Sequence, residues 1–217
     1  MQYRRLTRRR ALLGGVAGIA TLGWRRTARG ATDREPLPAA PAGAVTLILV
    51  ACLCAADGAS AAVEVSATGF LVKHEVMISA SERKVYSALL RDIGKWWDPQ
   101  HTYSGKSSNL SIDTRPGGCF CERLASGGGV AHMTVVNLQP FRLVRLTGAL
   151  GPLQESGLTG SLTWRLTSVG DVTKLEMSYS VGGYMEGGFD TMAPAVDEVL
   201  GHQVKRLKVF VETGKLP

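Results

Sequence analysis

The feature that most constrains the fold is one long amphipathic helical pattern at the end of a chain dominated by short alternating segments. Residues 190–212 carry an apolar stripe at helical spacing, and Gly214 follows as a C-terminal stop. Residues 109–181 before it read as about six short strands separated by turns. A curved antiparallel sheet with one apolar face needs a cover, and this helix is the one element long enough. The stripe consists of Val196, Val199, Leu200, Leu207 and Phe210.

The N-terminal part of the same domain supplies one more strand and two short helices. Residues 69–79 alternate between apolar and polar, which predicts a half-buried strand with His74 on the face toward the helix. Ser79 and Glu82 have capping-box spacing, so a helix is expected to follow, broken at Gly94 and closed at Trp96-Trp97. The sequence therefore predicts an α+β fold with a sheet of about seven strands.

The charge of the chain is concentrated in its first 61 residues. The formal net charge is +7, but residues 1–61 hold nine Arg against three acids, a net +6. Residues 62–217 hold sixteen basic and fifteen acidic residues, a net +1. A nearly neutral domain has no electrostatic footprint for a phosphate backbone, so nucleic-acid binding is excluded.

Residues 1–61 are expected to be an export leader, and residues 62–217 the folded domain. Two apolar segments occur one after the other: residues 11–24 follow a basic run, and residues 44–56 precede a run of small residues. Both segments are short for a membrane span. Ala59-Ser60-Ala61 fits a signal peptidase site, which predicts cleavage near Ala61 and an exported, periplasmic or secreted protein with no integral span in its mature form.

Two alternatives for the leader stay open. Leu49-Val50-Ala51-Cys52 fits a lipobox, in which case Cys52 carries a lipid anchor. The second alternative is a start codon that lies downstream of Met1, because two hydrophobic cores in one leader are unusual.

The order of elements resembles the helix-grip fold of the START-like superfamily, also called SRPBCC or the polyketide cyclase/dehydrase group. The resemblance covers residues 69–214. It is carried by residues 76–86, 95–97 and 116–122, by the Pro140 hairpin and by residues 206–208. It implies a cavity between the sheet and the C-terminal helix that holds an apolar small molecule.

Twelve residues are candidates for the wall or mouth of that cavity. Trp96 and Trp97 are adjacent, so one is expected in the core and the other on the cavity. His101 and Tyr103 would be polar anchors, and Tyr184 and Met185 would gate the entrance. Loops 150–154 and 182–188 are expected to overhang it. The candidates are Trp96, Trp97, His101, Tyr103, Cys119, Cys121, His132, Trp164, Met177, Tyr179, Tyr184 and Met185.

Cys119 and Cys121 share one face of a predicted strand. A disulfide between residues two apart along a strand is poorly suited to the Cβ separation that the bond requires. Two buried free thiols against the cavity wall are therefore expected, with Glu122 facing solvent. A redox-labile pair is the alternative.

His132 is a lone strand histidine, which more often has a structural than a catalytic role. Alternation places it on the face of Val130, Thr134 and Val136. With His74, Arg145, Glu176 and Tyr179 it makes up the polar strand residues that could point inward.

Three functions are compatible with these features. The first is an exported binding protein for a lipid, isoprenoid or aromatic metabolite. The second is an enzyme of the cyclase or dehydratase kind with a cavity His, Tyr or Glu as acid or base. The third is a protein-interaction module similar to the activator of a heat-shock ATPase. No cofactor fingerprint and no metal-ligand spacing occurs, so neither a cofactor nor a metal is expected. The absence of a catalytic motif favours the binding protein.

Overall fold

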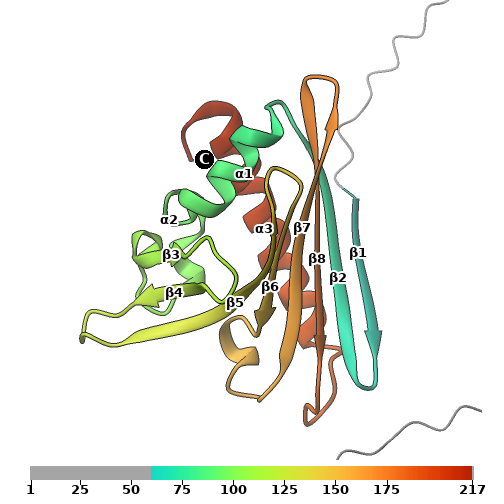
Figure 1. The fold of residues 1–217 in the computed structure, drawn as a ribbon. Coiled ribbons are helices and arrows are strands. Elements are labelled where there is room, and N and C mark those ends of the chain that lie inside the picture. Colours follow the sequence, from blue (N-terminus) through green and yellow to red (C-terminus); the bar gives the residue numbers. More distant parts are fainter. Residues whose placement is uncertain (1–59, 217) are drawn as a thin grey trace, which may run out of the picture. The chain divides into compact units, whose positions relative to one another are not determined.

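The computed structural model describes residues 60–216, which form one antiparallel sheet with one long helix (Figure 1). The strands are β1 (Ser60–Ser66), β2 (Gly69–Ile78), β3 (Leu110–Ile112), β4 (Cys119–Arg123), β5 (Gly129–Gln139), β6 (Leu143–Gly148), β7 (Thr159–Val169) and β8 (Val172–Gly182). The helices are α1 (Glu82–Arg91), α2 (Ile93–Trp96) and α3 (Met192–Thr213), with 3-10 turns η1 (Pro99–His101), η2 (Ser107–Asn109) and η3 (Gly151–Leu153). The predicted α+β class and element order are confirmed.

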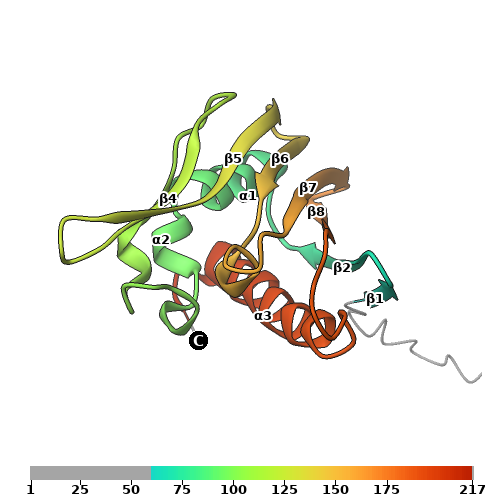
Figure 2. The same ribbon diagram turned by 90° about the horizontal axis from the view of Figure 1, so that it is seen from below.

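The sheet has the strand order β1-β2-β8-β7-β6-β5-β4-β3, and every neighbouring pair is antiparallel. Within residues 60–216 it has eight strands rather than about seven, because β1 pairs with β2 along its whole length. Strand β1 was not predicted, and its first two residues, Ser60 and Ala61, belong to the predicted leader. Figure 2 shows the sheet arching over α3.

The inward faces of β7 and β8 and one side of α3 contribute to the same core. Leu162, Trp164, Met177 and Tyr179 are at most 3% exposed, as the strict alternation of both strands predicts. From α3 the core receives Leu200, Val204 and Leu207. The helix ends as predicted, because Gly214 adopts a left-handed φ of 72° and its N–H donates to the Phe210 carbonyl.

Helix α1 begins two residues later than the predicted capping box. The N-cap is Ser81, whose hydroxyl accepts a hydrogen bond from the Lys84 N–H. Ser79 instead donates its backbone N–H to Glu212 near the end of α3. The Ser79 N–H, which the capping-box pattern assigns to the start of α1, is therefore used in a contact with α3 instead.

His74 lies against α3, as predicted, and it does so over a glycine. Its Nε2 is 3.1 Å from the Asp197 carbonyl oxygen and 2.8 Å from Asp197 Oδ1. A Cβ added at Gly201 would stand 2.7 Å from Cε1 of the His74 ring. Because the ring is held by Asp197, it has no room to yield.

We expect Gly201→Ala to lower the free energy of unfolding by about 1–3 kcal/mol, the usual cost of overpacking. Alanine is the better helix former by up to about 1 kcal/mol, but the contact with His74 outweighs that gain. In a His74→Ala background the same change should be neutral or stabilising. Urea unfolding of the four proteins measures the cycle, and a stabilising Gly201→Ala with His74 present would contradict the packing argument.

Strands β4 and β5 present different faces to the core than simple alternation predicts. Phe120 and Glu122 are each 1% exposed, so the inward face of β4 is theirs and not that of Cys119 and Cys121. On β5 the register shifts, because Phe120 pairs with Met133 while Cys121 pairs with Ala131. His132 is therefore the extra residue of a β-bulge.

The bulge explains why the predicted face of β5 is wrong beyond His132. His132 and Met133 are both buried although they are adjacent. Thr134 and Val136, which alternation groups with His132, are exposed. A bulge changes which residues face inward, and no period-two pattern anticipates it.

The export-like segments and Cys52 lie outside the described residues. Strand β1 starts at Ser60 and so includes Ala61, the last residue of the predicted leader. In residues 60–216 no helix has the length and apolar character that crossing a membrane requires.

Candidate functional site

A cavity of about 390 Å³ lies among η1, β4, β5, η3 and the N-terminal half of α3. This size is at the lower end of the range for small-molecule sites. Its walls are mostly apolar, and its polar side chains lie near the mouth with one exception. The lining residues are Trp97, Gln100, His101, Thr102, Tyr103, Leu110, Phe120, His132, Leu150, Gly151, Pro152, Leu153, Glu155, Met192, Ala195, Val196, Val199 and Leu200.

One wall is aromatic. Trp97 packs edge-on to Phe120 with ring centroids 5.9 Å apart, and its Nε1–H donates to the His101 carbonyl at 3.0 Å. The partner of Trp97 in sequence, Trp96, is 1% exposed and donates its Nε1–H to the Ala88 carbonyl. Trp96 is therefore a core residue, whereas Trp97 lines the cavity.

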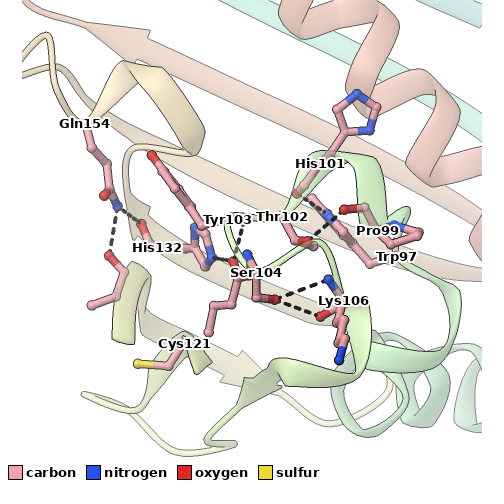
Figure 3. A network of polar contacts seen from close by, with 12 residues as sticks. Trp97, Pro99, His101, Thr102, Tyr103, Ser104, Lys106, Cys121, His132 and Gln154 are labelled. Atoms are coloured by element: carbon pink, nitrogen blue, oxygen red, sulfur yellow. Dashed lines mark hydrogen bonds and ion pairs between the residues drawn. The ribbon is translucent and has the colours of Figure 1, made fainter. Parts of the chain in front are cut away.

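Behind that wall a buried carboxylate holds the loop that follows η1. Glu122 accepts hydrogen bonds from the backbone N–H groups of Tyr103 and Ser104, at 3.1 and 2.5 Å. It also faces His132, whose Nε2 lies 3.0 Å from Glu122 Oε2. Figure 3 shows His132 beside Tyr103 and Ser104 of this loop. The Glu122 side chain is completely enclosed, so these three groups take the place of water.

The balance of burial and hydrogen bonding sets the charge of this pair. Burial by itself raises the pKa of Glu122, but the hydrogen bonds from Ser104, Tyr103 and His132 together lower that pKa below its ordinary value. Burial lowers the pKa of His132, and the bond and charge of Glu122 offset this only in part. At neutral pH the pair is thus an ionised carboxylate and a neutral imidazole.

The tautomer of His132 follows from this pairing. A carboxylate accepts hydrogen bonds and cannot donate, so Nε2 carries the ring proton and Nδ1 is an acceptor. Among residues 60–216 no group donates to Nδ1. His132 Nδ1 is not among the fully enclosed, unpartnered side-chain atoms of the described residues, so it is not sealed off from open space. The open space beside His132 is the cavity.

The η3 loop covers the cavity and is tied to the sheet by two polar side chains. The Tyr179 hydroxyl accepts from the Leu150 N–H and lies 3.4 Å from the Gly148 carbonyl. Gln154 donates to the carbonyls of Ala131 and His132. Burial raises the pKa of Tyr179 to about 12, so this hydroxyl stays protonated.

At the mouth, Asp98, His101 and His202 bring one ligand atom each within 4.8 Å of one another. Asp98 Oδ2 is 3.2 Å from His202 Nδ1 and 3.8 Å from His101 Nδ1, which suits the donor set of a zinc-type ion. However, His101 Nδ1 accepts a hydrogen bond from Gln203 Nε2. A metal ion would have to displace that bond.

Four of the twelve predicted cavity residues line the cavity: Trp97, His101, Tyr103 and His132. Trp96, Trp164 and Met177 are core residues, and Tyr179 supports the η3 loop from behind. Tyr184 is 83% exposed and Met185 packs at the edge of the core, so neither lines the cavity. Of the two predicted overhanging loops, residues 150–153 form part of the wall.

The expectation for the two cysteines is wrong. Cys119 and Cys121 form a disulfide, with Cα atoms 5.3 Å apart, and neither lines the cavity. The pair lies on the half-buried outer face of β4, at the β-bulge. The inference from an ordinary strand fails here because the register of β4 against β5 shifts between Phe120 and Cys121.

Phe120 and the α3 residues of the cavity wall were not among the predicted cavity residues, and neither was Glu122, the acid that holds the loop after η1. Val196, Val199 and Leu200 were identified as part of the apolar stripe that covers the sheet, and they face the cavity. An apolar stripe on a helix is expected both where the helix packs against the sheet and where it lines an apolar cavity. Glu122 had a detectable signal, a lone acid in an apolar strand, but its face was assigned from the cysteines.

No protein-family model matches the chain. No curated protein matches it either. Solved structures do match. A conserved protein of unknown function, EF2215 from Enterococcus faecalis, is 18% identical over 73% of this chain and 80% of its own, with a TM-score of 0.52. CalU16 from Micromonospora echinospora is 17% identical over 76% and 80%, with a TM-score of 0.51.

The Aha1 dimer from Colwellia psychrerythraea is 26% identical over 67% of this chain and 98% of its own, with a TM-score of 0.51. These likenesses show the fold, which is the helix-grip arrangement expected from the sequence. They do not by themselves assign an activity.

Proposed function

We propose that this chain is a START-like protein that is exported and binds an apolar small molecule, a lipid, isoprenoid or aromatic metabolite, in the cavity beside α3. The observation that carries the proposal is the cavity itself: about 390 Å³, walled by Trp97, Phe120, the η3 loop and the apolar face of α3. Transfer of an apolar ligand from water into such a space is favourable by about 25 cal/mol per Å² of buried apolar surface.

The experiment is native mass spectrometry of the protein produced from the full chain in its own host. We expect a co-purifying small molecule, and Val199→Trp should abolish it because indole fills the space beside the α3 wall. The matched control is Glu198→Trp, an exposed position on the same helix that does not line the cavity. A wild-type protein that is empty in this assay, or a ligand that survives Val199→Trp, would count against the proposal. The intact mass also locates the processed N-terminus.

A second candidate is an acid–base enzyme of the cyclase or dehydratase kind. One observation favours it, the Glu122–His132 pair: His132 lines the cavity, and its second ring nitrogen has no donor among residues 60–216. A carboxylate-oriented imidazole is a common general base. Conversion of the co-purified compound on incubation, lost in a His132 variant, would favour the enzyme. The chaperone-activator alternative rests on likeness of fold alone.

A further inference from the structure

We propose that the cavity selects neutral apolar molecules that carry a hydroxyl group, which donates a hydrogen bond to Nδ1 of His132. This inference rests on the proposed binding function and specifies the chemical class of the ligand. It follows from four properties of the cavity, namely the position of its polar groups, the tautomer of His132, the charges of the lining residues and the aromatic rings around the imidazole.

The first property is that His132 is the buried polar side chain of the cavity lining. Gln100, His101, Tyr103 and Glu155 are exposed, so water satisfies them whether or not a ligand is present. The His132 side chain retains 7% of its surface. A ligand that fills the cavity covers this remaining surface, so it must supply the hydrogen bond that water otherwise donates to Nδ1.

The second property is that the Glu122 carboxylate fixes the tautomer of His132, so that Nδ1 needs a hydrogen-bond donor. Glu122 is itself held by the N–H groups of Tyr103 and Ser104, so it cannot rotate away from His132 without leaving them unpaired. With Nε2–H committed to Glu122, the ring offers a lone pair to the ligand. A ketone, ether or ester oxygen has no proton to donate, so its lone pair would repel the lone pair of Nδ1. A hydroxyl donates.

The third property is the absence of cations. None of the lining residues among the described part of the chain is Lys or Arg, and Glu122 lies directly behind His132. A carboxylate or phosphate ligand would therefore be desolvated with no compensating charge and next to an anion. This disfavours fatty acids and phospholipid headgroups at the His132 end, and it favours neutral alcohols and phenols.

The fourth property is the aromatic surroundings of the imidazole. The ring centroid of Phe120 is 5.1 Å from that of His132, and that of Tyr103 is 5.9 Å away. Trp97 continues the wall at 5.9 Å from Phe120. A planar aromatic ring can pack against this wall at the distances that aromatic pairs prefer. A phenol can thus both pack its ring against the aromatic wall and donate a hydrogen bond to Nδ1 of His132.

The experiment compares three probes of nearly equal shape, 2-naphthol, naphthalene and 2-methoxynaphthalene, by isothermal titration calorimetry on the full-length protein. We expect wild type to bind 2-naphthol roughly tenfold tighter than either analogue, the order expected when a buried acceptor is left unpaired. His132→Phe keeps a planar ring but no acceptor, so the preference should disappear. Tyr184→Phe, which changes an aromatic side chain that is 83% exposed and outside the lining, should keep it.

A second measurement covers the case in which His132→Phe does not fold. In wild-type protein labelled with 15N-histidine, 2-naphthol should shift one imidazole Nδ1 resonance that naphthalene leaves in place. Equal binding of all three probes with no such shift would overturn the hydroxyl preference while leaving the apolar binding function standing. Binding of none of them would overturn both.

Discussion

Replacing Glu122 by Leu is expected to lower the free energy of unfolding by roughly 3–5 kcal/mol, because it leaves three donors that face a fully enclosed position without an acceptor. The donors are the N–H groups of Tyr103 and Ser104 and Nε2–H of His132. Leucine nearly matches the volume of glutamate, so the loss reports the hydrogen bonds rather than a cavity. The side chain is fully enclosed, so water cannot take over its role.

The matched control is Glu176→Leu on β8, a glutamate whose side chain is 40% exposed and lies 3.4 Å from Lys174. Exposed pairs of this kind contribute little, so the control should change stability by about 0.5 kcal/mol or less. Chemical denaturation of both variants measures the difference. A Glu122→Leu protein as stable as the control would show that the loop after η1 does not depend on the carboxylate.

This result also bears on the cavity. Tyr103 lines the cavity, and its backbone is held by Glu122. The same carboxylate sets the tautomer of His132. One buried acid thus connects the stability of the loop to the chemistry that the cavity offers, and the two are expected to change together.

Much of the fold could be predicted because its elements obey simple periods. The C-terminal helix was expected at 190–212 and spans Met192–Thr213. The last two strands were expected at 159–168 and 172–181, and each extends one residue further. Their alternation is regular from Thr159 to Gly182 because β7 and β8 pair without a register shift. Local pattern and tertiary pairing agree there.

The site was harder to predict because it lies where that regularity ends. The bulge at His132 changes the face of β5, and the same shift accompanies the Cys119–Cys121 disulfide on β4. His132 was identified as a candidate without its partner, since Glu122 was placed on the solvent face. Ten residues separate the two, and only the pairing of β4 with β5 shows that they touch.

The second large effect is expected at Trp96. Trp96→Ala should lower the free energy of unfolding by about 3–5 kcal/mol, the usual cost of truncating a buried tryptophan. The side chain is 1% exposed, and its ring centroid lies 5.6 Å from that of Trp97. Its Nε1–H donates to the Ala88 carbonyl of α1. Its removal leaves a void behind the cavity wall, while the Ala88 carbonyl keeps the hydrogen bond from the Asp92 N–H at the end of α1.

Tyr184→Ala is the matched control, because it removes an aromatic side chain that is 83% exposed. Its effect should stay within about 0.5 kcal/mol. The loss in Trp96→Ala should also weaken ligand binding, since Trp97 loses the surface against which its indole rests. Thermal or urea unfolding gives the first quantity and native mass spectrometry the second. If Trp96→Ala unfolds like wild type and retains its ligand, then the tryptophan pair neither closes the core nor supports the cavity wall.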